Sequence, residues 1–149
     1  MEEDYSTAKI TWQVINSLLQ EGKLDRYYQI DMSAVDRMTG MEFERFVANL
    51  LYRSGFANVA LTPGSNDQGV DIVAEKDGVW YAFQCKCYSY PLNNKPIQEV
   101  TAGKAFWKCE VGVVVTNSFF NQNAIDVAEV TGTELWDRHD LMKRLAEAE

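Results

Sequence analysis

The apolar residues between positions 39 and 55 recur at the spacing of an amphipathic helix. Five of them stand at i, i+3, i+4, i+7 and i+8, on one helical face: Phe43, Phe46, Val47, Leu50 and Leu51. Thr39 and Glu42 have the spacing of a capping box, and Gly55 is a typical helix stop. The pattern predicts a helix that begins near Thr39, ends before Gly55 and packs one face against a core.

A β-hairpin signal follows this helix. Two strand-like stretches, residues 70–76 and 79–88, flank Asp77-Gly78, a dipeptide typical of two-residue type I′ turns. Such a turn pairs Lys76 with Val79 and, further along, Asp71 with Gln84 and Gly69 with Lys86. Because side chains alternate between the two faces of a strand, one face of the hairpin is apolar. It collects Val70, Ile72, Ala74, Val79, Tyr81, Phe83, Cys85 and Cys87.

The other face of the predicted hairpin brings Asp71, Gln84 and Lys86 together on one exposed side. Oxygen ligands from Asp71 and Gln84 suit a hard cation such as Mg²⁺. Lys86 could orient or help to deprotonate a water and neutralise charge that develops on a phosphate. A slip of one residue in the turn would separate the three groups, so this prediction depends on the register.

The remaining pattern predicts helices and strands that alternate. After an apolar segment at 58–62 and the hairpin, we expect helices over 96–108 and 121–130, strands over 111–116 and 133–136, and a last helix capped by Asp137. This order predicts an α/β domain with a central mixed sheet flanked by helices. Apolar residues at helical spacing between Ile10 and Leu19 predict a helical appendage over residues 1–37, before a main domain over 38–149.

Composition and charge narrow the function. The chain has 149 residues, 46% of them hydrophobic, which is enough for one folded domain. The net charge of −8 argues against a protein that coats nucleic acid non-specifically. Its middle is nevertheless locally positive, because residues 84–108 carry one acid, Glu99, and four lysines: Lys86, Lys95, Lys104 and Lys108. The last three lysines are candidates for DNA contacts, with the solvated side of a helix as the equally weighted alternative.

Other features favour a reduced intracellular protein. No uncharged stretch approaches the length of a membrane span, and the acidic start, Met1 to Asp4, is unlike a signal peptide, so we expect a cytoplasmic protein with no membrane partner. Three cysteines do not make a disulfide framework. A zinc site from Cys85, Cys87, Cys109 and His139 is disfavoured, because cysteines two apart in a strand share one buried face.

Four motifs follow one another along the chain: Thr39-Gly40-Met41-Glu42-Phe43-Glu44-Arg45-Phe46, Asn66-Asp67-Gln68-Gly69-Val70-Asp71, Gln84-Cys85-Lys86 and Val113-Val114-Val115-Thr116-Asn117. In this order they resemble the catalytic domain of the Mrr-type restriction endonucleases, which belong to the PD-(D/E)XK nuclease superfamily. The similarity covers about residues 36 to 142.

The resemblance implies a restriction-endonuclease-like three-layer fold and a nuclease-like domain over residues 38–149. It implies that Asp71 binds Mg²⁺ or Mn²⁺, that Gln84 occupies the acidic position of the D/E-x-K element, and that Lys86 is its lysine. Glu44 matches the helix glutamate that holds a water at the metal. The superfamily usually has Glu or Asp at the position of Gln84, although glutamine is common in the Mrr branch. An amide brings no negative charge, so we expect weaker metal affinity than at a site with three carboxylates.

These observations lead to a metal-dependent DNA endonuclease as the expected function, with Asp71, Gln84, Lys86 and Glu44 as its catalytic residues and the first two with Glu44 as metal ligands. Because duplex cleavage requires two cuts, we expect a homodimer. No base-reading motif is recognisable, so a separate specificity subunit is a candidate partner. A Holliday-junction-resolvase-like nuclease and a non-catalytic DNA-binding or assembly module on the same fold are the alternatives, with a thiol or zinc protein further behind.

Overall fold

A computed structural model describes residues 32–63 and 69–148. This part of the chain contains a five-stranded sheet with strand order β1-β2-β3-β4-β5. The first three strands pair antiparallel, and the last two continue parallel to the third. The strands are β1 (Ala57–Leu61), β2 (Ile72–Lys76), β3 (Val79–Lys86), β4 (Val111–Thr116) and β5 (Glu134–Trp136). The predicted mixed sheet is therefore confirmed, with segment 58–62 forming most of an edge strand.

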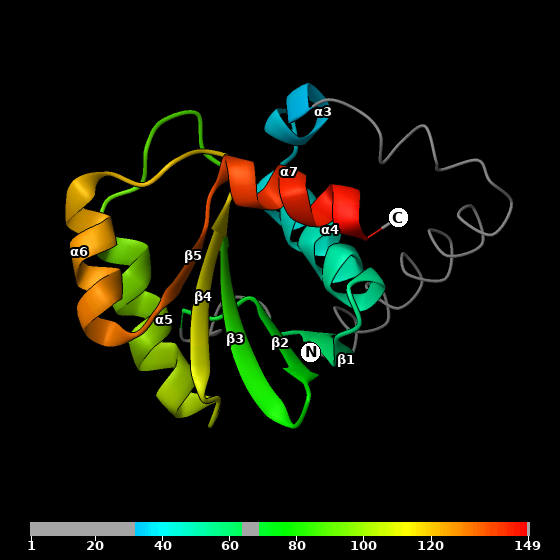
Figure 1. Ribbon diagram of the computed structural model, residues 1–149, viewed down its shortest axis with the longest axis vertical. Coiled ribbons are helices and arrows are strands. Elements are labelled where there is room, and N and C mark those ends of the chain that lie inside the picture. Colours follow the sequence, from blue (N-terminus) through cyan, green and yellow to red (C-terminus); the bar gives the residue numbers. More distant parts are fainter. Residues whose placement is uncertain (1–31, 64–68, 149) are drawn as a thin grey trace, which may run out of the picture.

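Helices cover both faces of this sheet. They are α3 (Met32–Asp36), α4 (Gly40–Arg53), α5 (Lys95–Phe106), α6 (Gln122–Thr131) and α7 (Arg138–Glu147). Helices α4 and α7 lie on one face, and α5 and α6 lie on the other (Figure 1). The predicted three-layer α/β architecture is confirmed.

The ends of α4 are fixed by the predicted side chains. The backbone N–H of Glu42 donates to Thr39 Oγ1 (3.1 Å), and the N–H of Thr39 donates to Glu42 Oε1 (2.9 Å), which completes a capping box. Gly55 follows the helix with φ of +91°. All five residues of the predicted apolar stripe are buried. Asp137 caps α7 in the same reciprocal way with Asp140.

The hairpin turn sets the predicted register. Asp77 and Gly78 both have positive φ, 53° and 81°, as a type I′ turn requires. Lys76 lies opposite Val79, and Ile72 lies opposite Phe83. The strands are shorter than predicted, since β2 begins at Ile72 and β3 ends at Lys86.

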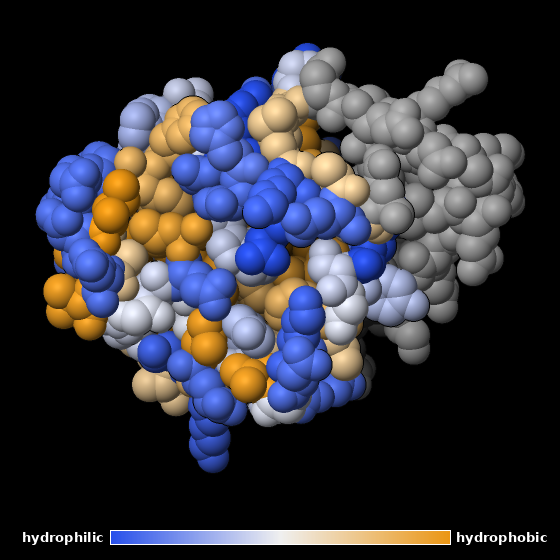
Figure 2. Space-filling view, in the orientation of Figure 1, coloured by the Kyte–Doolittle hydropathy of each residue, from blue (hydrophilic) through white to orange (hydrophobic). Residues whose placement is uncertain are grey.

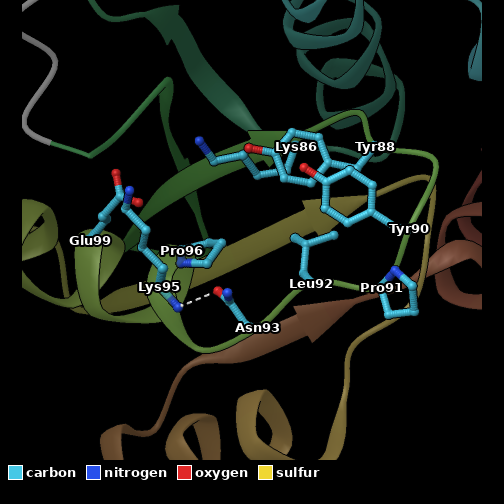
Figure 3. Close-up of a pocket in the computed structure, with 9 residues that line it drawn as sticks. All are labelled: Lys86, Tyr88, Tyr90, Pro91, Leu92, Asn93, Lys95, Pro96 and Glu99. Carbon is cyan, nitrogen blue, oxygen red and sulfur yellow. Dashed lines mark hydrogen bonds between the residues drawn. The ribbon is translucent and has the colours of Figure 1, made fainter.

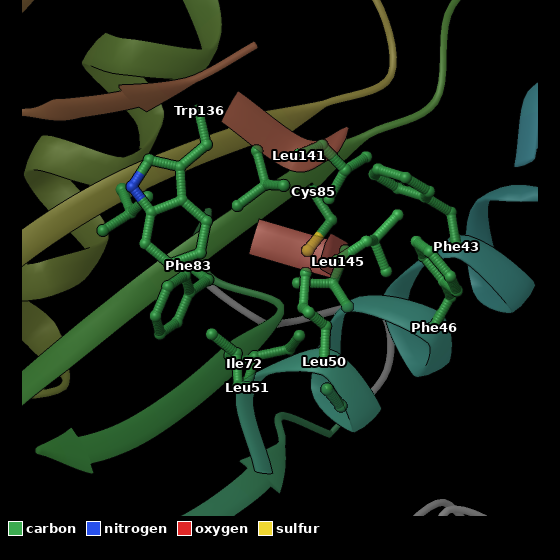
Figure 4. Packing of buried hydrophobic residues seen from close by; sticks show 14 of the residues in the cluster. Phe43, Phe46, Leu50, Leu51, Ile72, Phe83, Cys85, Trp136, Leu141 and Leu145 are labelled. Carbon is green, nitrogen blue, oxygen red and sulfur yellow. The ribbon is translucent and has the colours of Figure 1, made fainter. Parts of the chain in front are cut away.

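Two apolar cores hold the layers together. The first core packs α4 and α7 on the sheet and includes Phe43, Leu50, Phe83, Trp136 and Leu141, all nearly inaccessible to solvent (Figure 4). The second core packs α5 and α6 on the opposite face and consists of Val70, Ala82, Leu92, Ile97, Val100, Val114, Ala124 and Ala128.

The second core corrects two predictions about the hairpin. Val70 lies in the second core rather than with Ile72 in the first, because Gly69 has φ of +76° and the regular alternation of β2 does not extend back to Val70. The face that carries Gln84 is not open to solvent, because α5 and α6 cover it, and Gln84 is only 3% exposed.

The outer surfaces of the helical layers are mostly polar. Figure 2 shows hydrophilic side chains over α7 and apolar patches over α6, where Ile125 and Val130 are exposed. In the described ranges, no helix combines the length and the apolar character that crossing a bilayer requires. Cys85, Cys87 and Cys109 are free thiols.

The described end of the predicted appendage packs on the main domain. Met32 and Val35 of α3 are buried against the first core. The helix predicted between Ile10 and Gly22 lies outside the described residues. The boundary between residues 37 and 38 stays a prediction.

Candidate functional site

The start of β2 and the end of β3 meet at one edge of the sheet, because these strands are antiparallel. Asp71 directly precedes β2, and its N–H donates to the carbonyl of Phe83 (2.7 Å), the residue that lies opposite Ile72. The Asp71 carboxylate accepts a hydrogen bond on Oδ2 from the backbone N–H of Cys85 (2.7 Å). This bond holds the carboxylate beside the end of β3.

The Gln84 amide contacts the same carboxylate. We assign its nitrogen toward Gly69 and Asp71, because the opposite orientation would set its oxygen against acceptors only. The nitrogen then donates to the Gly69 carbonyl (2.8 Å) and to Asp71 Oδ2 (3.3 Å). The structure thus brings Asp71 and Gln84 together as the hairpin register predicted, with Gln84 as a buried donor that orients the carboxylate.

Glu44 and Lys86 both act electrostatically on the Cys85 thiol, whose backbone N–H holds Asp71. Burial raises the pKa of the Cys85 thiol well above its usual value; the carboxylates of Asp71 and then Glu44 raise it further, and the Lys86 ammonium opposes them. All three charged groups therefore lie near one buried sulfur atom. Since the thiolate is the nucleophile and metal ligand, a thiol held protonated does not favour zinc or thiol chemistry here.

The residues around Asp71 offer oxygen ligands of the kind that hard cations prefer. The carboxylates of Asp71 and Glu44 suit Mg²⁺ or Mn²⁺ better than zinc. Gln84, predicted as a further ligand, turns its amide nitrogen rather than its oxygen toward Asp71. Within residues 32–63 and 69–148, no group of three or more His, Cys, Asp or Glu side chains could hold a metal ion. A cation at this edge would therefore take ligands beyond those carboxylates from amide or backbone oxygens, water or substrate.

A cavity of about 320 Å³ lies beside the site, and Lys86 is one of the residues that line it. The cavity is lined by Lys86, Tyr88, Tyr90, Pro91, Leu92, Asn93, Lys95, Pro96 and Glu99 (Figure 3). Lys86 Nζ lies 6.0 Å from the centroid of the Tyr88 ring, within cation–π range. The lysine is half-buried, so its charge is available to a ligand in the cavity.

The three other lysines do not form one stripe. Lys95 begins α5 and lines the cavity with Lys86. Lys104 lies nine residues later, which at about 100° per residue is the opposite side of the helix, and it packs beside Gly112. Lys108 follows the end of α5. Only Lys95 is therefore brought close to the Asp71 edge.

Sequence reasoning missed two features of the site. Gly69 lies against the first turns of α5, where a Cβ would stand 2.5 Å from the Glu99 carbonyl oxygen, and the hairpin pattern gave no sign of this close approach. The aromatic residues Tyr88 and Tyr90 were not assigned a role; their alternation directly after Lys86 was the available signal. Asn66 and Asp67 of the second motif lie outside the described residues.

Asn117 fixes the chain that follows Lys86. Its Oδ1 accepts a hydrogen bond from the N–H of Tyr88 (2.8 Å), and its Nδ2 donates to Asp36 Oδ1 (2.9 Å). Asp36 also forms an ion pair with Arg138 (2.7 Å). Asn117, the last residue of the fourth motif, therefore connects the ends of β3 and β4 to α3 and α7.

One known protein family and two solved structures are similar to this chain. A family model of the Mrr catalytic domain, described as a restriction endonuclease, matches residues 35–145, more than half of the chain. A search of curated proteins finds no match.

Two solved structures are similar. A protein of unknown function, AF1548, is 26% identical over 63% of this chain and 55% of its own, with a TM-score of 0.53. The DNA modification-dependent restriction endonuclease AspBHI is 23% identical over 71% of this chain and 30% of its own, with a TM-score of 0.56, which is a likeness of fold. The chain thus spans about half of the first protein and less than a third of the second. Because this family model matches more than half of its length, the chain belongs to the Mrr-type restriction endonuclease family.

Proposed function

We propose that this chain is a divalent-metal-dependent endonuclease that hydrolyses phosphodiester bonds in DNA. The observation that carries the proposal is the hydrogen-bonded carboxylate of Asp71, held by Cys85 N–H and by Gln84 at the sheet edge that Lys86 shares. The family match supports the same chemistry.

The residues at this edge have separate roles in the proposed reaction. Asp71 and Glu44 supply carboxylate oxygens to Mg²⁺ or Mn²⁺, and Gln84 holds the Asp71 carboxylate in place. The cation, when bound, supplies polarisation of water and stabilisation of negative charge on phosphate oxygens. Lys86 binds the phosphate and neutralises charge that develops on it, because its ammonium faces an open cavity beside the carboxylates.

In the proposal, DNA contacts extend from this edge to the start of α5. Lys95 lines the cavity of Lys86 and contacts a neighbouring phosphate. Lys104, on the opposite side of α5, and Lys108, beyond its end, take no part in this contact. Cleavage of both strands of a duplex requires two sites, so the proposal includes a homodimer. A monomeric mass in solution, together with full duplex cutting, would contradict the dimer. The proposal also includes a separate specificity subunit that supplies base recognition.

The test compares cleavage by the wild type, Asp71→Ala and Lys86→Ala on methylated, unmethylated and branched DNA with Mg²⁺ or Mn²⁺. We expect each variant to lose activity by at least about 100-fold, since each group acts directly on metal or phosphate. The exposed residues Asp126 and Lys143 provide the charge-matched controls Asp126→Ala and Lys143→Ala, which keep activity. Equal activity in the wild type and both site variants removes the assignment, and activity on branched DNA alone identifies a junction-resolving enzyme.

A non-catalytic DNA-binding or assembly module is the second candidate. It is favoured by Gln84 in place of a carboxylate and by the absence of a three-acid group among the described residues. DNA binding that is unchanged in EDTA, with no cleavage in Mg²⁺ or Mn²⁺, would support this alternative over the endonuclease.

A further inference from the structure

We propose that the cavity beside Lys86 binds one unpaired nucleobase of the DNA substrate, stacked on Tyr90. This inference rests on the proposed DNA endonuclease function and names the state of the nucleotide next to the phosphate at Lys86. The cavity volume of about 320 Å³ is at the lower end of the range for small-molecule sites, roughly 300–1,000 Å³.

The two tyrosines form a stacked aromatic platform. The ring centroids of Tyr88 and Tyr90 are 5.0 Å apart with an interplanar angle of 22°. Tyr88 is half-buried between this contact and Lys86, whereas Tyr90 is 59% exposed. Figure 3 shows the two rings beside one another along one wall, with the residues of α5 across the cavity. The platform thus exposes much of one large aromatic side chain beside a phosphate-binding lysine.

The backbone that carries these rings is held in place by the next loop of the sheet. The N–H of Tyr88 donates to Asn117 Oδ1 (2.8 Å), and the carbonyl of Tyr90 accepts a hydrogen bond from Ser118 Oγ (2.8 Å). Leu92 bonds that loop through its N–H and its carbonyl. A platform fixed before binding loses little conformational entropy when a ligand stacks on it.

The chemistry of the cavity fits a nucleotide. An aromatic face accepts any base by stacking, and the lysines Lys86 and Lys95 face the negative phosphates on either side. Asn93 and Glu99 add hydrogen-bonding groups that suit a base edge. A base inside a duplex cannot reach Tyr90, because it is stacked between its neighbours. The occupant is therefore a base that is unpaired or turned out of the helix.

The experiment measures binding without cleavage, by fluorescence anisotropy in EDTA. The probes are a labelled duplex with one unpaired 2-aminopurine, the same duplex with an abasic residue at that position, and the fully paired duplex. We expect the wild type to bind the 2-aminopurine probe more tightly than the abasic one and to quench its fluorescence by stacking. Tyr90→Ala should weaken binding of the base-containing probe roughly 5- to 150-fold, leave the abasic probe unchanged and abolish the quenching.

Two variants control the comparison. Tyr90→Trp keeps an aromatic face and should retain both the affinity and the quenching. Phe106→Ala removes an aromatic side chain that is 60% exposed at the other end of α5 and should change nothing. Circular dichroism melting checks that each variant is folded.

The outcomes separate this inference from the proposed function. Equal affinity of the wild type for the base-containing and abasic probes overturns the inference, as does equal weakening of both probes in Tyr90→Ala or absence of binding to every probe. Base-dependent binding without cleavage in Mg²⁺ or Mn²⁺ removes the endonuclease and keeps the nucleobase site. Cleavage in Mg²⁺ or Mn²⁺ without base-dependent binding removes the nucleobase site and keeps the endonuclease.

Discussion

Gly69, in the loop before β2, contacts both the Gln84 amide and the first turns of α5. Its carbonyl accepts the Gln84 hydrogen bond, its φ is +76°, and a Cβ on it would lie 2.5 Å from the carbonyl oxygen of Glu99. Two separate physical requirements therefore select glycine at this position: a left-handed backbone and a close approach between two main chains.

Gly69→Ala should lower the free energy of unfolding by about 3 kcal/mol, because left-handed strain and a clash with backbone act together. Gly78→Ala is the matched control, since Gly78 has φ of +81° but no atom within 4 Å of the position that a Cβ would occupy. It should cost only the strain, about 1–2 kcal/mol. Urea denaturation of both variants measures the difference, and equal destabilisation would show that the Glu99 contact relaxes freely.

Gln84 is the residue at which this site departs from a three-carboxylate arrangement. Gln84→Glu replaces a donor by a charge that lies about as close to Asp71 Oδ2 as the amide does (3.3 Å), and it leaves the Gly69 carbonyl opposite an acceptor. In EDTA the variant should therefore melt several degrees below the wild type. Mn²⁺ should raise its melting temperature more than that of the wild type, because a cation offsets the added charge.

Thermal unfolding with and without Mn²⁺ measures both effects of Gln84→Glu. Gln98→Glu, an exposed position on α5, controls for a new negative charge in this region. A Mn²⁺ shift in Gln84→Glu no larger than that of the wild type would argue against a cation at Asp71.

At the scale of single elements, α4 carries Glu44, the second carboxylate of the proposed metal site, near a helix end that local interactions define. The capping box of Thr39 and Glu42 satisfies two backbone N–H groups, and the buried stripe from Phe43 to Leu51 fixes the rotation of the helix on the sheet. Glu44 stands in the first turns of this helix, so fraying of that end would displace it.

Thr39→Ala should destabilise the protein by about 1 kcal/mol, because it removes the acceptor for the Glu42 N–H. Glu42→Gln should cost less, since glutamine at this position can still accept from the Thr39 N–H. Chemical denaturation gives both values, and cleavage assays should show a loss for Thr39→Ala no greater than its change in stability explains. A cost for Glu42→Gln equal to that for Thr39→Ala would mean that the charge of Glu42, rather than the hydrogen bonds, stabilises the cap.

The sequence predicted those elements whose geometry is decided by local chemistry. Asp77-Gly78 adopts the positive φ angles of its turn type, and this fixed the pairing that places Asp71 beside Gln84. The burial of Gln84 and the side on which Val70 packs depend on α5, which lies further along the chain, so the alternation in the hairpin did not reveal them.

In the candidate site too, local patterns predict some features, and contacts between distant segments decide the others. The Tyr88–Tyr90 platform depends on hydrogen bonds from the loop after β4, a contact between distant segments that no local pattern contains. By contrast, the separation of Lys95 from Lys104 follows from helical periodicity once the first residue of α5 is known.

At the scale of the whole molecule, polar contacts join segments from the two ends of the described chain at the sheet edge that carries the site. Asp36 of α3 accepts hydrogen bonds from Arg138 at the start of α7 (2.7 and 3.1 Å) and from Asn117 after β4. The hydrogen bond from Arg138 holds the pKa of Asp36 below its ordinary value of 3.8, against a smaller opposing effect of burial. The same contact raises the pKa of Arg138.

Because the pKa of Asp36 is lower in the folded protein than in the unfolded chain, this contact stabilises the fold above about pH 4 and is lost as pH falls through the folded pKa. Asp36→Ala should therefore reduce the free energy of unfolding by at most about 1 kcal/mol at pH 7, as the pair is partly exposed to solvent. At pH 3 the difference between the variant and the wild type should be smaller than at pH 7. Urea unfolding at both pH values measures this, with the exposed Glu129→Ala as control. A difference that persists unchanged at low pH would assign the role of Asp36 to packing of α3 rather than to its charge, in line with the burial of Met32 and Val35 against the first core.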